Sequence, residues 1–395
     1  MKLAARLEAY QTNGLDGVLA AKDAQTIAFA GGYPDPALFP QAALAAAWAQ
    51  SASEKTLQYA GPTGDLALRR QLAQRMGQDA VACTAADLML TQGAQQALDL
   101  MAKLLLDPGD GLVVEGPTYI GALSAFDAYQ PTYYEVPVQR DGMDLTALQQ
   151  VLATRKVKMI YTVPDFQNPT GTVMSLAKRR ALVALANRYD VVILEDAPYR
   201  QLRYRGVQLP PIKAFDTEDR VVFVSSFSKI LAPSLRLGWL VAGPSLMAPL
   251  RALKGGCDLE TSGLTTAAVA AYLQRNDLDR HIARLKEVYS AKMARMHTDL
   301  AAALPSGFTL THPEGGFFLW LTAPQGFDML AFAQGPLRDA NVTVVPGSGL
   351  SPFGHFQNAA RLSFTGASLA EIDRGCRRLC AALTAAGRPA QVVAR

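Results

Sequence analysis

Between about residues 85 and 245, short runs of β-branched and other apolar residues alternate with stretches of helical periodicity. Several runs are apolar at consecutive positions, so both faces of each strand are expected to be buried. Buried strands separated by helices indicate an α/β protein with a mostly parallel, doubly wound sheet. The seven runs assigned to this sheet are Leu88–Thr91, Leu112–Glu115, Tyr133–Val136, Met159–Val163, Val191–Glu195, Val221–Ser225 and Leu237–Ala242.

The helical stretches have clear ends. One helix is predicted over Gln95–Leu106, before a Pro/Gly turn, and another over Ser175–Tyr189, with Ser175 as its N-cap. Past residue 245 a long helix, Leu278–Leu304, precedes short strands and a last helix, Leu369–Ala386. This order predicts a smaller α+β domain. Its strands are expected at Phe308–Thr311, Phe317–Leu321, Val342–Val345 and Ala360–Phe364.

The composition is that of an ordinary globular protein, since 50% of the 395 residues are hydrophobic and 18% are charged. The net charge is only +4 and the basic residues are scattered among acids, so no nucleic-acid partner is expected. The four cysteines lack the neighbours of a zinc site, which predicts no metal and free thiols in a reducing compartment. No apolar run is long enough to span a bilayer, so a cytoplasmic protein is expected.

Polar or aromatic residues follow the ends of five predicted strands. Asp196 follows VVILE, Ser226 follows the run that begins VVFV, and Asn168 comes shortly after MIYTVP. A Gly93-Ala94-Gln95 turn opens the helix after LML, and Tyr119 lies just beyond LVVEG. Ligands of an open parallel sheet bind beyond the carboxyl ends of its strands. These residues are therefore expected to share one site.

The tetrapeptide Ser226-Phe227-Ser228-Lys229 follows a predicted buried strand, and Arg236 comes soon after. A lysine that is desolvated beside another cation becomes a nucleophilic amine that can bond to an aldehyde. The serines and the arginine could then hold a phosphate. Pyridoxal 5'-phosphate (PLP) needs this arrangement, although the same four residues also occur in solvated loops.

Other residues match further parts of a PLP site. A carboxylate from Asp196 would keep the ring nitrogen protonated, so that the ring accepts electrons; the alternative is a helix N-cap. Asn168 and Tyr199 could donate hydrogen bonds to the ring's phenolic oxygen; the alternatives are an Asx-turn and an interface tyrosine. Tyr119 offers a flat face for stacking, or is a packing residue.

Two further predictions concern anions. The Gly93-Ala94-Gln95 turn presents backbone N–H groups at a helix start, which attract a phosphate, and Ser226, Ser228 and Arg236 would complete the cup. The alternative for Arg236 is a surface ion pair. Arg361 lies inside an otherwise apolar strand, so it needs a buried anion. That anion is either a substrate carboxylate or an internal Asp or Glu.

Ten segments, taken in order, resemble the fold type I PLP-dependent aminotransferases (aminotransferase class I/II). The resemblance is strongest to the subgroup of 2-aminoadipate and kynurenine aminotransferases and the catalytic domains of MocR regulators. The segments are FAGGYPDPALFP (Phe29–Pro40), LQYAGPTGDLALR (Leu57–Arg69), LTQGAQQALDL (Leu90–Leu100), EGPTY (Glu115–Tyr119), PDFQNPTG (Pro164–Gly171), EDAPY (Glu195–Tyr199), SSFSKILAPSLRLGW (Ser225–Trp239), PEGGFFLWL (Pro313–Leu321), VVPGSGL (Val344–Leu350) and NAARLSFT (Asn358–Thr365).

The resemblance implies an N-terminal arm and part of a small domain over residues 1–45, a large PLP-binding domain over 46–255, and the rest of the small domain over 256–395. It implies a homodimer in which Tyr59 reaches the partner's cofactor phosphate. Gly32, Asn168 and Arg361 would contact the substrate's α-carboxylate, and Tyr33 would help to form the side-chain pocket. The match begins by about residue 29, so no DNA-binding domain is expected before it.

The chain departs from the family pattern at two places. Ala94 stands where the family usually has a serine, so one hydroxyl is missing from the phosphate cup. The arm segment Leu15–Leu19 carries Asp16 and no arginine for a distal carboxylate, which argues against aminoadipate specificity.

The resemblance implies a ping-pong aminotransferase that moves an amino group from an L-amino acid, aromatic or branched aliphatic, to a 2-oxo acid such as 2-oxoglutarate. Lys229, the catalytic base and acid, would carry the Cα proton. A PLP-dependent C–S β-lyase and a non-catalytic ligand-sensing protein of the same fold are alternatives. A nucleotide-binding α/β protein is disfavoured, because neither GxGxxG nor GxxxxGK[ST] follows the first strand.

Overall fold

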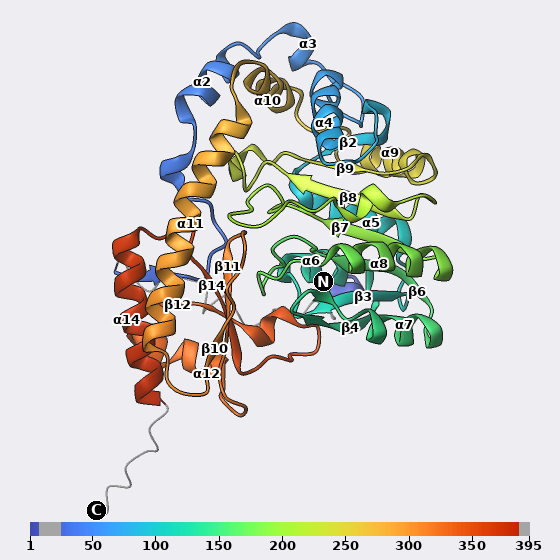
Figure 1. The fold of residues 1–395 in the computed structure, drawn as a ribbon. Helices are drawn as coiled ribbons and strands as arrows, with labels where there is room; N and C mark the ends of the chain where they lie inside the picture. Colours follow the sequence, from blue (N-terminus) through green and yellow to red (C-terminus); the bar gives the residue numbers. More distant parts are fainter. Residues whose placement is uncertain (8–24, 387–395) are drawn as a thin grey trace, which may run out of the picture.

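The structure is a computed structural model that describes residues 1–7 and 25–386 of the chain. Figure 1 shows a large sheet with helices on both of its faces, beside a smaller part that contains two long helices and a short sheet. The smaller part combines a short N-terminal segment from about residue 25, in blue, with the C-terminal portion of the described chain, in orange to red.

All seven strands predicted for the large sheet are present, and a two-residue strand adds an eighth. The strand order is β2-β9-β8-β7-β6-β3-β4-β5. The β8, β7, β6, β3 and β4 strands are parallel, whereas β9 is antiparallel to both β2 and β8, and β5 is antiparallel to β4. The bounds are β2 (Leu88–Thr91), β3 (Gly111–Gly116), β4 (Thr132–Gln139), β5 (Gly142–Met143), β6 (Val157–Thr162), β7 (Val192–Asp196), β8 (Val221–Ser226) and β9 (Gly238–Val241).

Both faces of this sheet are buried, as the consecutive apolar runs predicted. On β3, Leu112 and Val114 belong to one core cluster and Val113 to another. Helices α7 and α8 pack on the face of Val113, and α5 and α6 on the opposite face. The bounds are α5 (Gly93–Leu105), α6 (Ile120–Phe126), α7 (Leu145–Thr154), α8 (Leu176–Tyr189) and α9 (Pro244–Asp258).

The helix ends agree closely with the sequence pattern. Ser175 caps α8, since its side chain accepts a hydrogen bond from the backbone N–H of Lys178. Helix α5 starts at Gly93, two residues earlier than its predicted start at Gln95. The first turn of α5 thus follows the end of β2 at Thr91 after a single residue.

The smaller part contains a four-stranded sheet in the order β10-β11-β14-β13. Helices α11 and α14 pack against each other beside this sheet (Figure 1). The predicted strand at Val342–Val345 is two short strands, because β12 pairs with β1 while β13 pairs with β14. The bounds are α11 (Leu278–Ala303), β10 (Thr309–Leu310), β11 (Phe318–Thr322), α12 (Met329–Gln334), α13 (Pro336–Asp339), β12 (Val342–Thr343), β13 (Val345–Pro346), β14 (Ala359–Ser363) and α14 (Leu369–Ala386).

The N-terminal segment connects the two parts. Strand β1 (Ile27–Ala28) pairs with β12 of the smaller part, and α2 (Gln41–Ala49) then crosses to pack against α10 (Gly263–Arg275). Helices α3 (Glu54–Leu57) and α4 (Leu66–Gln78) follow on the side of the large sheet. The boundaries proposed near residues 45 and 255 stay predictions.

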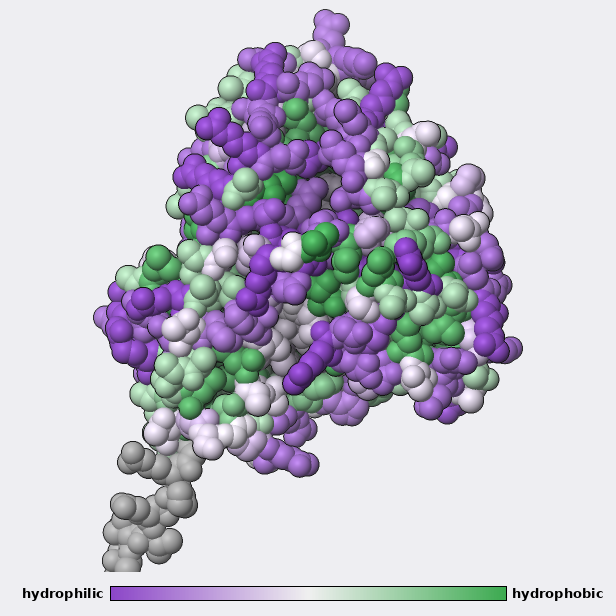
Figure 2. All heavy atoms as spheres, viewed as in Figure 1, coloured by the Kyte–Doolittle hydropathy of each residue, from purple (hydrophilic) through white to green (hydrophobic). Residues whose placement is uncertain are grey.

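Within residues 1–7 and 25–386, none of the helices combines the length and apolarity needed to cross a bilayer. On the face shown in Figure 2, apolar residues lie in patches that polar residues interrupt. Both observations agree with the absence of a long apolar run in the sequence.

Candidate active site

A cavity of about 400 Å³ lies at the carboxyl ends of the strands of the large sheet, where β11, β13 and β14 of the smaller part face them. It contains nearly all of the predicted site residues. Those that line it are Gly32, Tyr33, Ala94, Gln95, Tyr119, Asn168, Asp196, Tyr199, Ser226, Ser228, Lys229, Arg236 and Arg361. A larger groove of about 880 Å³ elsewhere is lined by none of them.

Lys229 follows β8 and extends into the cavity, where its Nζ donates a hydrogen bond to the Gly32 carbonyl at 2.8 Å. The pKa of Lys229 is lowered to about 8, chiefly by burial and also by the charges of Arg361 and Arg236, against the opposing effect of Asp196. A lysine with this pKa is partly neutral near physiological pH, which is the state that attacks an aldehyde. The solvated-loop interpretation of the tetrapeptide is therefore wrong, because Lys229 is held inside a cavity.

Asp196 is the last residue of β7, and its two carboxylate oxygens differ in their hydrogen bonding. Oδ2 accepts a hydrogen bond from the Tyr161 hydroxyl at 2.9 Å, whereas the buried Oδ1 has no hydrogen-bond partner within the described part of the chain. Burial raises the pKa of Asp196 to about 6, against the effects of Tyr161 and Lys229. A turn, not a helix, follows Asp196, so the N-cap alternative is wrong. An unpaired acceptor at the cavity wall fits a protonated ring nitrogen.

Arg361, Asn168 and Tyr199 form a connected group. Arg361 Nη1 donates to Asn168 Oδ1 at 2.9 Å, Arg361 Nη2 donates to the Ala30 carbonyl at 2.7 Å, and Asn168 Nδ2 lies 3.5 Å from the Tyr199 hydroxyl. The arginine comes from β14 and the amide from the loop after β6, so the contact joins the two parts of the molecule.

The guanidinium of Arg361 is buried, and none of the described acidic residues pairs with it. The residue is 6% exposed, stacks 4.3 Å from the centre of the Phe318 ring, and forms none of the ion pairs found among the described residues. Its buried Nε has no hydrogen-bond partner there either. No Asp or Glu of residues 1–7 and 25–386 is thus the internal partner that the alternative required, and burial lowers the pKa of Arg361 from its usual value. Such a cation requires an external anion.

The predicted phosphate cup comes from α5 and from the segment after β8. Gly93 has a φ of +68°, a left-handed conformation that favours glycine, and the guanidinium of Arg236 packs closely against this turn. Ser226 Oγ lies 2.8 Å from Ser228 Oγ, and Arg236 Nη2 donates to the Gln92 carbonyl at 3.3 Å. The side chain of Gln95 donates to the Gly121 carbonyl. Its backbone N–H belongs to the first turn of α5, where N–H groups have no acceptor within the helix.

The remaining predicted residues lie at the edge of the site or outside it. Tyr119 is the N-cap residue of α6 and lines the cavity, while Tyr33 stands at its mouth with 72% of its surface exposed. Tyr59 is 77% exposed and does not line the cavity of its own chain. The predictions for Leu15–Leu19 and Asp16 lie outside the described residues.

The sequence analysis missed three polar residues behind the site. Tyr161 bonds to Asp196, and Glu115 and Gln167 bond to each other behind the loop that carries Asn168. A tyrosine in a strand buried on both faces was an available signal, because a buried hydroxyl needs a partner. The identity of that partner depended on the pairing of β6 with β7.

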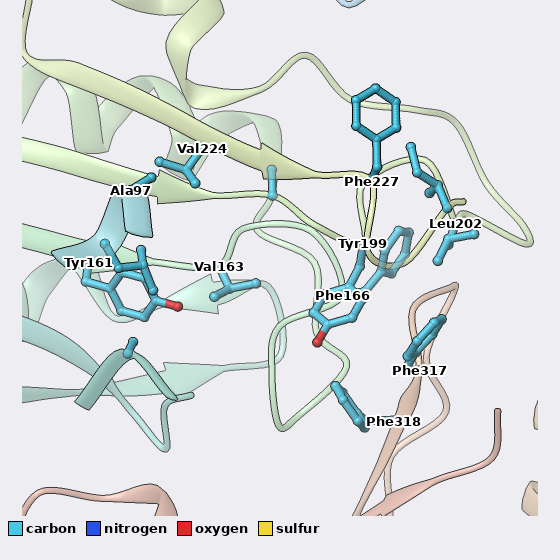
Figure 3. Close-up of a cluster of buried hydrophobic side chains, with 14 of the residues drawn as sticks. Ala97, Tyr161, Val163, Phe166, Tyr199, Leu202, Val224, Phe227, Phe317 and Phe318 are labelled. Atoms are coloured by element: carbon cyan, nitrogen blue, oxygen red, sulfur yellow. The ribbon is translucent and has the colours of Figure 1, made fainter. Parts of the chain in front are cut away.

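Aromatic side chains connect the site to the smaller part. Phe317 and Phe318 lie on the hairpin that approaches Tyr199 in Figure 3, with ring centres 5.4 and 5.6 Å from that of Tyr199. The Tyr161 ring lies deeper, beneath the strand ends, and packs edge-on against Phe126. On the side of the smaller part, the cavity is therefore lined by Phe318, with Phe317 packed beside it.

Comparison with known proteins identifies the class. The family described as aminotransferase class I and II matches residues 27–379, and the chain belongs to it. Among curated relatives, an aromatic-amino-acid aminotransferase of Thermococcus litoralis is 37% identical over 89% of this chain and 87% of its own length. A 2-aminoadipate transaminase of Thermus thermophilus is 35% identical over 90% of each chain.

A solved kynurenine aminotransferase of Pyrococcus horikoshii, in complex with PMP, superposes with a TM-score of 0.90 at 34% identity, covering 98% of this chain and 96% of that one. The predictions of a fold type I architecture, of amino-group transfer and of pyridoxal phosphate as the cofactor are thereby confirmed. The observed cavity provides a lysine, a buried carboxylate oxygen without a hydrogen-bond partner and an arginine without an acidic partner, both as judged within the described residues, and these groups fit the cofactor and its substrate.

Proposed function

We propose that this aminotransferase takes an aromatic or branched aliphatic L-amino acid as donor and a 2-oxo acid, 2-oxoglutarate in the first instance, as acceptor, in a ping-pong cycle. The observation that carries the proposal is Arg361, which is buried in the cavity wall and has no acidic partner in the part of the chain that the structure describes. A guanidinium in this position binds the α-carboxylate that amino acids and 2-oxo acids share. One site can therefore serve both half-reactions in turn.

The cavity offers a partner for each polar group of the cofactor. When bound, pyridoxal phosphate supplies an aldehyde that takes up the amino group and a ring that withdraws electrons. Asp196 would hold the ring nitrogen protonated, Asn168 and Tyr199 would donate to the phenolic oxygen, and Tyr119 would stack on the ring. The groups proposed for the phosphate are the backbone N–H groups of Gly93, Ala94 and Gln95, the hydroxyls of Ser226 and Ser228, the guanidinium of Arg236 and the partner subunit's copy of Tyr59.

Lys229 would act as the base and acid of the reaction. Its Nζ would take the proton from the substrate's Cα and later return it, which requires a pKa near the working pH. The value of about 8 that burial and the two arginines produce meets this requirement. Phe317 and Phe318 would exclude water from this side of the cavity.

The donor class follows from the cations of the cavity. The described lining contains three cationic residues, Lys229, Arg236 and Arg361. Their proposed partners are the aldehyde, the phosphate and the α-carboxylate, respectively. No cation of the described lining is left to bind a carboxylate on the donor's side chain. This favours a donor with an aromatic or aliphatic side chain. The distal carboxylate of 2-oxoglutarate would then be bound by neutral donors or by groups of the partner subunit.

We also propose that the enzyme acts as a cytoplasmic homodimer. Leu57, Tyr59 and Leu259 are exposed by 57–77% of their surfaces around α3 and the end of α9, and burying them against a second copy would remove this apolar area from water. The four cysteines, all in the described part of the chain, are free, which suits a reducing compartment. Sedimentation of the purified protein measures the oligomeric state.

The decisive experiment is borohydride reduction of the loaded protein followed by peptide mass spectrometry, which should place a pyridoxyl adduct on Lys229. A panel of amino acids, read by conversion of the bound cofactor to its amine form, then identifies the donor, and 2-oxoglutarate and pyruvate are compared as acceptors. Cystathionine with a pyruvate assay tests the C–S lyase alternative. An unmodified Lys229 would refute the assignment.

A further inference from the structure

Glu115 is a buried acid that the proposed chemistry does not use. It is the fifth residue of β3 and is 1% exposed. Its carboxylate accepts hydrogen bonds from the Thr162 hydroxyl at 2.7 Å, the Val163 backbone N–H at 3.1 Å and the Gln167 side chain at 3.3 Å. All three donors are neutral and belong to the end of β6 or the loop after it. A buried carboxylate held in this way fixes one strand end to the next.

The side chain of Gln167 uses its whole hydrogen-bonding capacity. Nε2 donates to Glu115 Oε2 at 3.3 Å and to the Pro117 carbonyl at 2.7 Å, and Oε1 accepts from the backbone N–H and the hydroxyl of Thr170 at 2.8 and 2.7 Å. An amide has two N–H donors and one oxygen with two lone pairs, so no capacity is left. Gln167 is itself 1% exposed, and its rotamer is therefore determined by partners on both sides.

The two loops joined by Gln167 both carry site residues. Tyr119 comes two residues after Pro117, and Asn168 directly follows Gln167. Asn168 in turn accepts a hydrogen bond from Arg361. A displacement of the Gln167 side chain would thus move the stacking ring and the amide relative to each other, and would move the amide relative to the arginine.

We propose that Gln167, held by Glu115, is a positioning residue that sets Tyr119 and Asn168 relative to each other for cofactor and substrate. The inference rests on the proposed roles of those two residues in the cofactor site. It assigns Gln167 no contact with either ligand. The Glu115–Gln167 pair acts only through the two loops.

If Gln167 only stabilised the fold, its substitution would lower stability without changing the binding of cofactor or substrate. Glu195 provides a matched control for such a purely structural effect. Glu195 is the last residue but one of β7, is 0% exposed, and accepts hydrogen bonds from the backbone N–H groups of Ile212 and Lys213, both at 2.8 Å. Those partners lie on a short 3₁₀ helix, Ile212–Phe215, and not on a loop of the site. Glu195→Gln therefore perturbs an equally buried carboxylate without touching the two site loops.

The test variant is Gln167→Glu, which keeps the shape of the side chain. It removes the donor to Pro117 and places a second carboxyl beside Glu115, and two such groups at this distance cannot both be ionised. We expect the dissociation constant of pyridoxal phosphate for the apoprotein and KM for the amino acid each to rise about tenfold. The visible circular dichroism of the bound cofactor should change as well. Glu195→Gln should lower the unfolding temperature but leave all three readouts at wild-type values.

A milder variant covers the case in which Gln167→Glu does not fold. Thr170→Val removes one hydroxyl donor and leaves the backbone N–H, so smaller changes of about two- to fivefold in the same readouts are expected. Wild-type values of all three readouts in a folded variant would overturn the positioning role. If wild-type protein takes up no cofactor on Lys229, the proposed function fails first, so the two failures are distinguishable.

Discussion

The Tyr161 hydroxyl is expected to keep Asp196 ionised, and Tyr161→Phe tests this. The variant removes one oxygen and leaves the ring packed against Phe126. Tyr161 is fully buried and Asp196 is 3% exposed, so water cannot replace the lost hydrogen bond. A hydrogen bond to an ionised partner contributes about 1.5–3 kcal/mol, and one to a neutral partner about 0.5–1.5 kcal/mol. The loss should therefore be larger when Asp196 is charged.

The sign of the pH dependence follows from the pKa of Asp196. Burial raises it to about 6 in the folded protein, above the value of the unfolded chain. Ionising Asp196 thus costs stability as the pH rises from about 4 through about 6. Removal of the Tyr161 donor increases that cost. Tyr161→Phe should lose about 1.5–3 kcal/mol of unfolding free energy at pH 8 and only about 0.5–1.5 kcal/mol at pH 5.

The assay is urea unfolding of the apoprotein at both pH values, at matched protein concentration because oligomerisation contributes to stability. Tyr129→Phe is the control, since it removes a tyrosine–aspartate bond of the same 2.9 Å length, to Asp99, away from the cavity. In the loaded enzyme, Tyr161→Phe should also lower kcat, because a more basic Asp196 takes a larger share of the ring proton. Equal losses at both pH values, with unchanged kcat, would refute the reasoning.

Three further predictions concern separate groups. Arg361→Gln should raise KM for the amino acid about 10- to 100-fold, because the charged hydrogen bond to the substrate's carboxylate is lost. The dissociation constant of the cofactor, measured by absorbance titration, should stay within about twofold of the wild-type value, which is roughly the error of such a comparison. The rate at which the apoprotein captures pyridoxal phosphate should rise with pH and level off above about 8, since Lys229 reacts only as the neutral amine; a stopped-flow profile that is flat between pH 6 and 9 would contradict the lowered pKa. Asp165→Asn should lower the unfolding free energy by about 3–5 kcal/mol, because it leaves the buried guanidinium of Arg179 without its anion and leaves Arg200 with Asp79 alone. A loss below about 1 kcal/mol in urea unfolding would show that the charges are compensated elsewhere.

Sequence periodicity and local chemistry determined most of the architecture. The seven strand segments were visible because a sheet covered on both faces requires consecutive apolar residues. Helix ends such as Ser175 were visible because capping is a local hydrogen bond. The candidate site was visible too, since loops after parallel strands converge at one edge, so Lys229 and Asp196 could be assigned together.

Only the tertiary structure decided how these residues are partnered. The sequence left the anion of Arg361 open, because an internal acid could have come from any other segment, and the fold instead brings Asn168 and the Ala30 carbonyl to it. The fold also gives the two carboxylate oxygens of Asp196 different surroundings. Oδ2 accepts a hydrogen bond from Tyr161, whereas Oδ1 has no partner among the described residues. Hydrogen bonds between distant segments depend on strand register and loop geometry, which no local pattern encodes.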